Sequence, residues 1–102
     1  MRPIIRPHAP DFVFHIPGDM KLNLVVVEVK AVNAELGGIR KDLQTLSYFV
    51  SEEVGYHLGI QLVYGSSERA LANFAAEFRK MNPAKLQLFW HKYPGEGATR
   101  VL

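Results

Sequence analysis

Two stretches near the amino terminus have the hydrophobic pattern of β-strands. Residues 12–16 are aromatic or β-branched, and the turn-forming residues 17–19 follow them. Residues 22–30 are apolar on both alternating faces until Glu28, a pattern typical of a strand covered by helices on both sides of its sheet. We therefore predict two strands joined by a short turn, with the second as the central strand.

Two further stretches predict strands later in the chain. Within 57–64, every second residue is apolar, so that one face is shared by Leu58, Ile60, Leu62 and Tyr64. The last strand is predicted at 85–90. The glycines and the proline that follow it predict a flexible tail over 94–102.

Between these strands the apolar residues recur at three- and four-residue steps, which predicts two amphipathic helices. The first helix is expected to begin after Asn33 as its N-cap and to stop at Gly55. Its apolar positions are Leu36, Ile39, Leu43, Leu46, Val50 and Val54. The second follows the turn residues 65–67 and stops at Asn82-Pro83, with apolar positions at Ala70, Leu71, Phe74, Ala75 and Phe78. The order strand, strand, helix, strand, helix, strand predicts an α/β fold with a mixed β-sheet flanked by helices.

Length and composition restrict the possibilities further. A chain of 102 residues with 48% hydrophobic content has the size of one domain. Three of its first ten residues are prolines, so we expect an extended lead-in over 1–10, followed by the domain over 11–93. The chain has no cysteine, which excludes disulfides and thiolate metal sites, and leaves oxygen or imidazole ligands for any metal.

Charge and hydropathy bear on partners and location. The formal net charge of +2 is compatible with a polyanionic partner but does not require one. The most apolar stretch is much shorter than a bilayer crossing, and the amino terminus has no apolar segment of signal-peptide length. We therefore expect a cytoplasmic protein without a membrane partner.

Two acidic residues occupy positions that a hairpin would bring together. Facing residues of an antiparallel hairpin have numbers with a constant sum, so Asp11 faces Glu28 if the turn is centred between residues 19 and 20. The same register pairs Val13 with Val26. Neighbouring carboxylates repel unless a cation or a proton lies between them, so this pair is a candidate metal site.

A lysine and a histidine are predicted on the same face as the two acids. Lys30 is two residues after Glu28, so the period of a strand places its ammonium group beside the carboxylates. There it could position or deprotonate a water molecule, or neutralise charge that develops on a phosphate. The hairpin register also places His15 on this face. The four histidines of the chain have no metal-ligand spacing among themselves.

These residues resemble the signature of a known superfamily. Pro10-Asp11, a gap of strand length and then Glu28-Val29-Lys30 resemble the PD-(D/E)XK nuclease signature. Gln44 and Tyr48 stand four residues apart on the predicted helix and resemble the Gln-x-x-x-Tyr motif of the exonuclease-like branch. The resemblance covers more than half of the chain.

The resemblance implies a restriction-endonuclease-like fold and hydrolysis of DNA phosphodiester bonds with Mg²⁺ or Mn²⁺ as the cofactor. Asp11 and Glu28 would bind the metal together with the backbone carbonyl of Val29, and Lys30 would orient the attacking water. Gln44 would assist catalysis near the metal or the substrate. The residues expected to orient the substrate are Tyr48 and His15.

Simpler interpretations exist for each of these residues. Asp11 could be a turn carboxylate that hydrogen-bonds local backbone, and Glu28 with Lys30 could form a solvated ion pair. Gln44 suits any exposed helix position, and Tyr48 could belong to the core.

The chain also departs from the superfamily pattern. Members usually have a helix and a strand before the first acid, whereas ten residues precede Asp11 here. The chain could be a truncated copy, a fragment completed by another chain, or an inactive module that binds nucleic acid or a protein. An exposed strand edge and an uncovered apolar sheet face would favour a homodimer.

Overall fold

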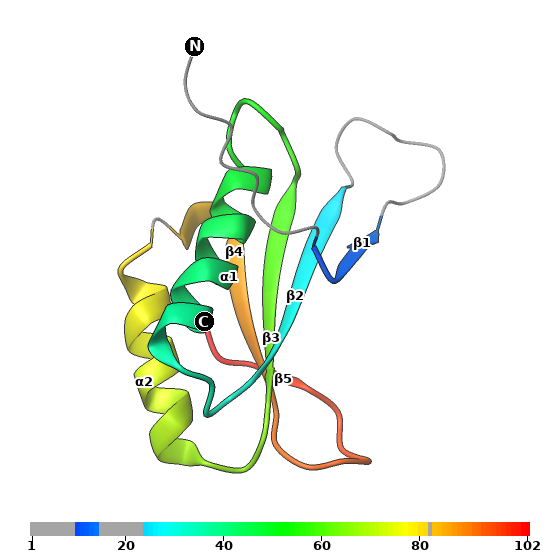
Figure 1. The fold of residues 1–102 in the computed structure, drawn as a ribbon. Helices are drawn as coiled ribbons and strands as arrows, with labels where there is room; N and C mark the ends of the chain where they lie inside the picture. Colours follow the sequence, from blue (N-terminus) through cyan, green and yellow to red (C-terminus); the bar gives the residue numbers. More distant parts are fainter. Residues whose placement is uncertain (1–9, 15–23, 82) are drawn as a thin grey trace.

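A five-stranded sheet forms one layer of the molecule, and two helices form the other (Figure 1). The computed structural model describes residues 10–14, 24–81 and 83–102. The elements are, in chain order, β1 (Phe12–Phe14), β2 (Val25–Ala31), α1 (Leu36–Phe49), β3 (Leu58–Tyr64), α2 (Glu68–Arg79), the 3-10 turn η1 (Pro83–Lys85), β4 (Leu86–His91) and β5 (Thr99–Arg100). The described residues form a single compact α/β domain, and its sheet is mixed as predicted.

The strands lie in the order β1-β2-β3-β4-β5. The inner strands β2, β3 and β4 run parallel, and the edge strands β1 and β5 pair antiparallel to their neighbours. The middle strand is β3, so the prediction that β2 is central is wrong by one position. Helices α1 and α2 each connect two parallel strands, as a parallel pairing requires.

The pairing of β1 with β2 has the predicted register. Val13 lies opposite Val26, Phe12 lies opposite Val27, and Phe14 lies opposite Val25. Continuing this register by one residue brings position 11 opposite position 28. His15, which the same register places on the face of the two acids, lies outside the described part of the chain.

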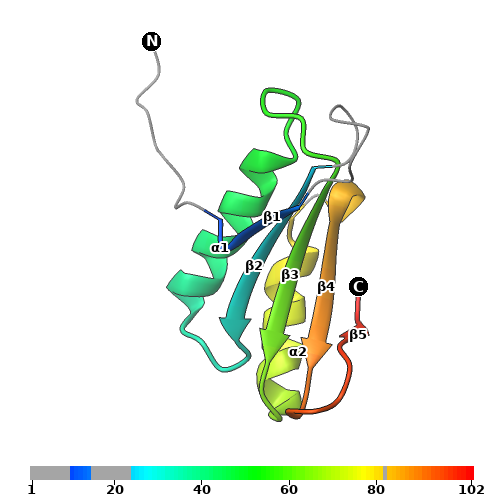
Figure 2. The same cartoon turned by 90° about the vertical axis from the view of Figure 1, so that its right-hand side faces the viewer.

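Both helices pack on the same face of the sheet (Figures 1 and 2). Helix α1 lies over β2 and β3, and α2 contacts β4. Gly59 permits this close approach, because a Cβ atom there would lie 2.8 Å from Leu86 Cδ2 and 3.5 Å from Leu46 Cβ. The sequence predicts helices on both faces, and within the described ranges the second face has none.

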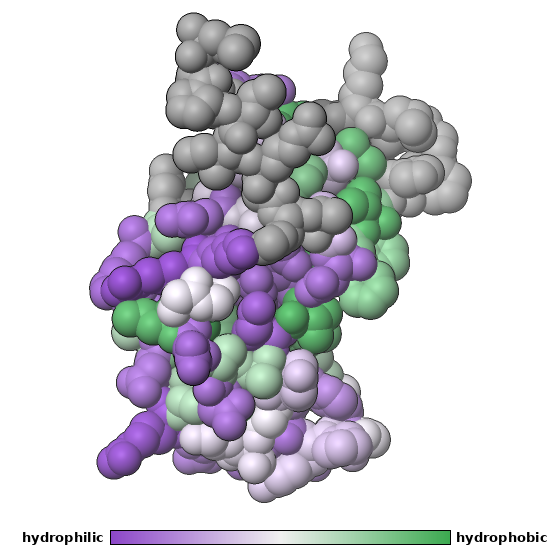
Figure 3. Space-filling view, in the orientation of Figure 1, coloured by the Kyte–Doolittle hydropathy of each residue, from purple (hydrophilic) through white to green (hydrophobic). Residues whose placement is uncertain are grey.

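The face without helices is mainly apolar. Phe12 and Phe14 stack on one another at the β1 edge with ring centroids 6.2 Å apart, and both are about half exposed. Figure 3 shows hydrophobic side chains gathered along this edge, next to hydrophilic side chains over the helices. By strand alternation, the same face carries the apolar side chains of Val25, Val27, Val29, Leu58, Ile60, Leu62, Tyr64 and Phe89. Toward the β4–β5 edge it also carries the polar residues Gln87, His91 and Arg100.

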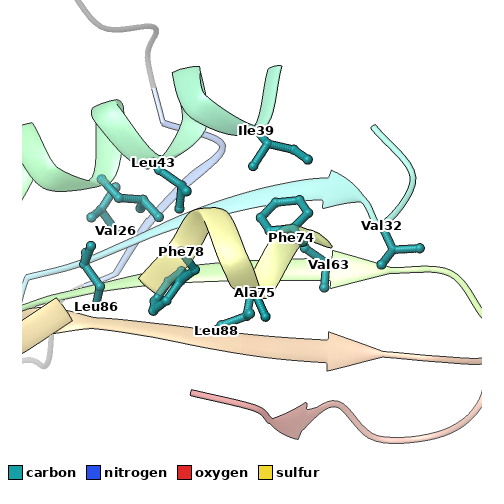
Figure 4. Close-up of a cluster of buried hydrophobic side chains, with 11 residues drawn as sticks. Val26, Val32, Ile39, Leu43, Val63, Phe74, Ala75, Phe78, Leu86 and Leu88 are labelled. Atoms are coloured by element: carbon teal, nitrogen blue, oxygen red, sulfur yellow. The ribbon is translucent and has the colours of Figure 1, made fainter. Parts of the chain in front are cut away.

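The hydrophobic core lies between the helices and the sheet (Figure 4). Side chains from the apolar stripes of α1 and α2 meet residues that alternate along the parallel strands. The buried cluster is Val26, Val32, Ile39, Leu43, Leu46, Val63, Phe74, Ala75, Phe78, Leu86 and Leu88.

Both ends of α1 differ from the prediction. Its N-cap is Glu35 rather than Asn33, and the Glu35 side chain makes no capping hydrogen bond. The helix ends at Phe49 rather than at Gly55. The Ser51 hydroxyl donates a hydrogen bond of 2.6 Å to the Tyr48 carbonyl, and this local bond favours a turn over another helical turn.

Helix α2 agrees more closely with the sequence. Its N-cap is Ser67, whose hydroxyl accepts a hydrogen bond from the backbone N–H of Ala70 at 3.1 Å. Neither α1 nor α2, the two α-helices in the described residues, is long and apolar enough to cross a membrane.

The segment predicted as a flexible tail contains a strand. Phe89 of β4 lies opposite Arg100 of β5. Beyond β5, the Val101 N–H donates to the Leu88 carbonyl at 2.7 Å, and the Leu88 N–H donates to the Leu102 carbonyl at 3.1 Å. The apolar side chains of Val101 and Leu102 pack against the core, which explains why this end of the chain joins the sheet.

Candidate active site

Asp11 and Glu28 lie side by side where β1 enters its pairing with β2. The Asp11 backbone N–H donates to Glu28 Oε2 at 3.3 Å, and the Val29 N–H donates to Asp11 Oδ2 at 2.7 Å. Each carboxylate therefore accepts a hydrogen bond from the opposite strand. The register of the hairpin produces this arrangement, because facing residues of an antiparallel pair point to the same side of the sheet.

The environment of Glu28 favours a bound proton or cation. Its pKa is raised to about 7, first by burial and then by the hydrogen bond and charge of the Asp11 carboxyl group and the charge of Asp42, while the hydrogen bond from the Asp11 backbone N–H lowers it. Only 4% of the Glu28 residue is exposed. A divalent cation bound between Asp11 and Glu28 would remove their repulsion, so the two groups suit a cation chemically.

The donor set also fits the ion that the resemblance implies. Mg²⁺ prefers oxygen ligands, keeps several waters, and is commonly bound through one or two carboxylates. The N–H and C=O of one strand residue point to the same side, and the Val29 N–H points to Asp11. The Val29 carbonyl therefore faces the Asp11 side as well. Among the described residues, no three or more His, Asp or Glu side chains are grouped to hold a metal ion. The oxygens that this site offers to a cation are two carboxylates and one backbone carbonyl.

Lys30 lies on the helix face of β2, two residues after Glu28, and reaches helix α1. Its ammonium Nζ is 3.3 Å from Asp42 Oδ1, and the Lys30 side chain is 31% exposed. A Cβ atom at Gly38 would lie 3.8 Å from the same Nζ, so the first turns of α1 approach the ammonium closely. The ammonium therefore lies between the strand and the helix.

Gln61 on β3 forms hydrogen bonds with both β2 and α1. It faces Glu28 across the β2–β3 pairing and is fully buried. Its amide Nε2 donates to the Glu28 backbone carbonyl at 3.2 Å and to Asp42 Oδ2 at 3.4 Å. Both amide hydrogens thus have acceptors, one on β2 and one on α1.

Asp42 is a buried carboxylate on the helix. Burial raises its pKa, whereas the charge and hydrogen bond of Lys30 and the hydrogen bond of Gln61 lower it. The Asp11 charge also raises it, which places Asp42 within electrostatic range of the two strand acids. The described residues of the site are Asp11, Glu28, Lys30, Asp42 and Gln61.

The predicted helix motif lies apart from this cluster. Gln44 is exposed, and it follows Asp42 by two residues, which turns it roughly 200° around the helix axis. Tyr48 is 40% exposed and contacts the ring of Phe49, with centroids 5.6 Å apart. The structure thus brings Asp11 and Glu28 into contact and places Lys30 on the same face of β2, with its ammonium on Asp42. Gln44 and Tyr48 lie on the outer side of α1. Their roles stay predictions, and His15 lies outside the described residues.

Sequence reasoning missed Asp42 and Gln61. Asp42 lies three residues after Ile39 and four before Leu46, so it sits within the apolar stripe of α1. An acidic residue within an apolar stripe was the signal that could have identified Asp42 as a buried site residue. Gln61 shares the helix face of β3 with Gly59 and Val63, and this face is the buried one. The opposite face of β3 is more apolar, so the sequence contained no signal that Gln61 would be buried.

Comparisons with protein-family models, with curated proteins and with solved structures find no match.

Proposed function

We propose that this protein is a Mg²⁺-dependent nuclease with a restriction-endonuclease-like fold that hydrolyses phosphodiester bonds of DNA. The observation that carries the proposal is the contact between Asp11 and Glu28, joined by hydrogen bonds across two strands, with Lys30 on the same face. DNA as the substrate rests on the motif's resemblance to PD-(D/E)XK nucleases.

The contacts of Asp11, Glu28 and Lys30 support a role for each of them. Asp11 and Glu28 bind the divalent cation, and the Val29 carbonyl supplies a third oxygen. When bound, Mg²⁺ or Mn²⁺ polarises the phosphoryl group and lowers the pKa of a water molecule. Lys30 has three N–H donors, of which one is directed to Asp42, so two remain to orient water and to stabilise charge on the phosphate. In this proposal Gln44 and Tyr48 contact the substrate from the exposed side of α1.

Cleavage of plasmid DNA by the purified protein tests the proposal. We expect cleavage with Mg²⁺ or Mn²⁺ and none in EDTA. Glu28→Ala and Lys30→Ala should each reduce the rate by about 100-fold or more, because each removes a charge that acts on the transition state. Glu77→Gln is the matched control, since this carboxylate on α2 pairs with Arg40 and Lys80 away from the site. Cleavage that persists in Glu28→Ala would indicate a contaminating nuclease and would contradict the proposal.

A second candidate is a module that retains the fold, does not cut, and binds nucleic acid or a protein partner. The apolar sheet face without a helix favours it, because such faces usually mark interaction sites. The two candidates differ in one result, since the module would leave DNA intact with every divalent ion tested.

A further inference from the structure

Asp42 and Gln61 share features that the proposed metal site does not explain. Neither donates to or accepts from the Asp11 or Glu28 side chains in the hydrogen bonds of the described residues. Both are buried, and burying a carboxylate and an amide costs free energy unless their partners compensate. Gln61 donates a hydrogen bond to Asp42, and Asp42 forms an ion pair with the Lys30 ammonium.

Gln61 fixes the carboxylate that holds the lysine. Its Nε2 binds the Glu28 backbone on one side and Asp42 Oδ2 on the other, which leaves Asp42 Oδ1 directed at Lys30 Nζ. The Gln61 Oε1 atom is buried without a hydrogen-bond partner, at a cost of about 1–3 kcal/mol. The two hydrogen bonds that the amide group donates, to the Glu28 carbonyl and to Asp42, offset part of this cost.

We infer that Asp42 is a positioning residue for Lys30 and that Gln61 orients Asp42 for that task. This inference rests on the proposed nuclease function, because it assigns Lys30 to the reacting phosphate. A lysine side chain loses much rotamer freedom when it is held in one place. The ion pair with Asp42 restricts the Lys30 ammonium before substrate binds. The two other N–H groups of the ammonium stay available for the reacting phosphate and water near Asp11 and Glu28.

Two measurements test the inference, and one of them does not depend on cleavage. The first is ¹³C relaxation of the Lys30 Cε atom in lysine-labelled protein, for the wild type and for the variants Asp42→Asn and Gln61→Met. Both substitutions keep the approximate shape of the side chain. We expect an ordered Lys30 Cε in the wild type, a mobile one in both variants, and no change in the control Glu77→Gln.

The second measurement is steady-state cleavage with Mg²⁺. Asp42→Asn should lower kcat by about 10–100-fold, the range for residues that orient a catalytic group, with KM changed less than about 3-fold. Asp42→Glu should recover part of the loss. In a Lys30→Ala background, Asp42→Asn should cause no further loss, because the group that it positions is absent.

The outcomes separate the two proposals. If Lys30 Cε is equally mobile in the wild type and in Asp42→Asn, the positioning role is overturned whether or not the protein cuts DNA. If the variants loosen Lys30 but kcat is unchanged, or if Asp42→Asn costs activity without Lys30 present, the positioning role is also overturned. If the wild type does not cut DNA with any divalent ion, both the nuclease proposal and the role of Asp42 in catalysis are overturned. The relaxation data then still show whether Asp42 holds the Lys30 ammonium in place.

Discussion

Glu28 is a carboxyl group that the fold keeps from water and places against a second carboxyl group. Its pKa of about 7 means that the folded protein retains the Glu28 proton at pH values where an unfolded chain, with an ordinary value of 4.5, has released it. Between these values the unfolded state binds fewer protons than the folded state. The free energy of unfolding therefore falls as the pH rises through this range.

The raised pKa of Glu28 predicts how the stability of the metal-free protein depends on pH. In EDTA, the free energy of unfolding should decrease from about pH 5 to about pH 7, with a contribution from Glu28 of at most about 3 kcal/mol. Glu28→Gln should remove that contribution, because the amide cannot titrate. Urea unfolding of both proteins across this range measures the difference.

Magnesium should reverse the trend, since the ion competes with the proton for Glu28. The wild type should gain more stability from Mg²⁺ at pH 8 than at pH 5, and Glu28→Gln should gain little at either. An equal pH slope in the wild type and in Glu28→Gln would show that Glu28 is not the titrating group.

The sequence was sufficient to place Asp11, Glu28 and Lys30 on one face of the sheet, but it did not predict that Asp42 joins them. The three predicted residues follow from two periodicities, the constant sum of a hairpin and the two-residue repeat of a strand. The position of Asp42 depends on how α1 is rotated over the sheet. That rotation is set by packing of the whole core, including the close approach at Gly59, and a local pattern does not determine it.

The connection from β3 to α2 depends on Gly65. Its φ of +125° is a conformation that side chains rarely adopt, and a Cβ atom there would lie 2.7 Å from Val32 Cγ1. Its backbone also accepts a hydrogen bond from Trp90 Nε1 at 2.8 Å and donates one to the His91 carbonyl at 3.1 Å. The residue thus joins the ends of three elements.

Gly65→Ala should therefore lower the free energy of unfolding by about 1–3 kcal/mol. Gly37→Ala provides the matched control, because Gly37 lies in the first turn of α1 with nothing within 4 Å of a Cβ atom. This change should raise stability by about 0.5–1 kcal/mol, since alanine favours a helix. Chemical denaturation of both variants measures the effects, and a Gly65→Ala variant as stable as the wild type would contradict the argument.

The elements were predictable where a period repeats often enough to be recognised. The inner strands and both helices show several repeats, and their positions agree within a few residues. Strand β5 has two residues, too few to show a period, and it forms because Val101 and Leu102 reach the core. The end of α1 depends on the Ser51 hydroxyl, which competes for a backbone carbonyl that hydrophobic spacing does not report.

The two faces of the sheet are unequal, because both helices of the described residues pack on one of them. Parallel strands are usually buried on both faces, and β2, β3 and β4 are parallel. Their apolar residues on the second face explain why the sequence predicts helices on both sides. The apolar character of the inner strands on that face was therefore predictable from the sequence, whereas the lack of a covering helix within the described residues was not.

A second copy of the chain is the partner that we propose for this face. The residues of β1, β2 and β3 that alternation places there are Val, Ala, Leu, Ile and aromatic residues without charge, so two copies that meet through this part of the face would do so without like-charge repulsion. Joining two such faces would remove apolar area from water on both copies. We therefore expect a homodimer whose dissociation depends on concentration.

Sedimentation equilibrium between about 1 and 100 μM, a range that spans affinities common for association, measures this dimer. Phe14→Lys should shift the protein toward the monomer, because it places a charge at a side chain that is 55% exposed on the proposed interface. The control is Leu36→Lys, at a side chain that is 46% exposed at the start of α1 in the helix layer. Since both residues are exposed, neither substitution should prevent folding, and circular dichroism confirms that point. A wild-type monomer throughout the range, or equal dissociation in the two variants, would show that the uncovered face does not join two copies.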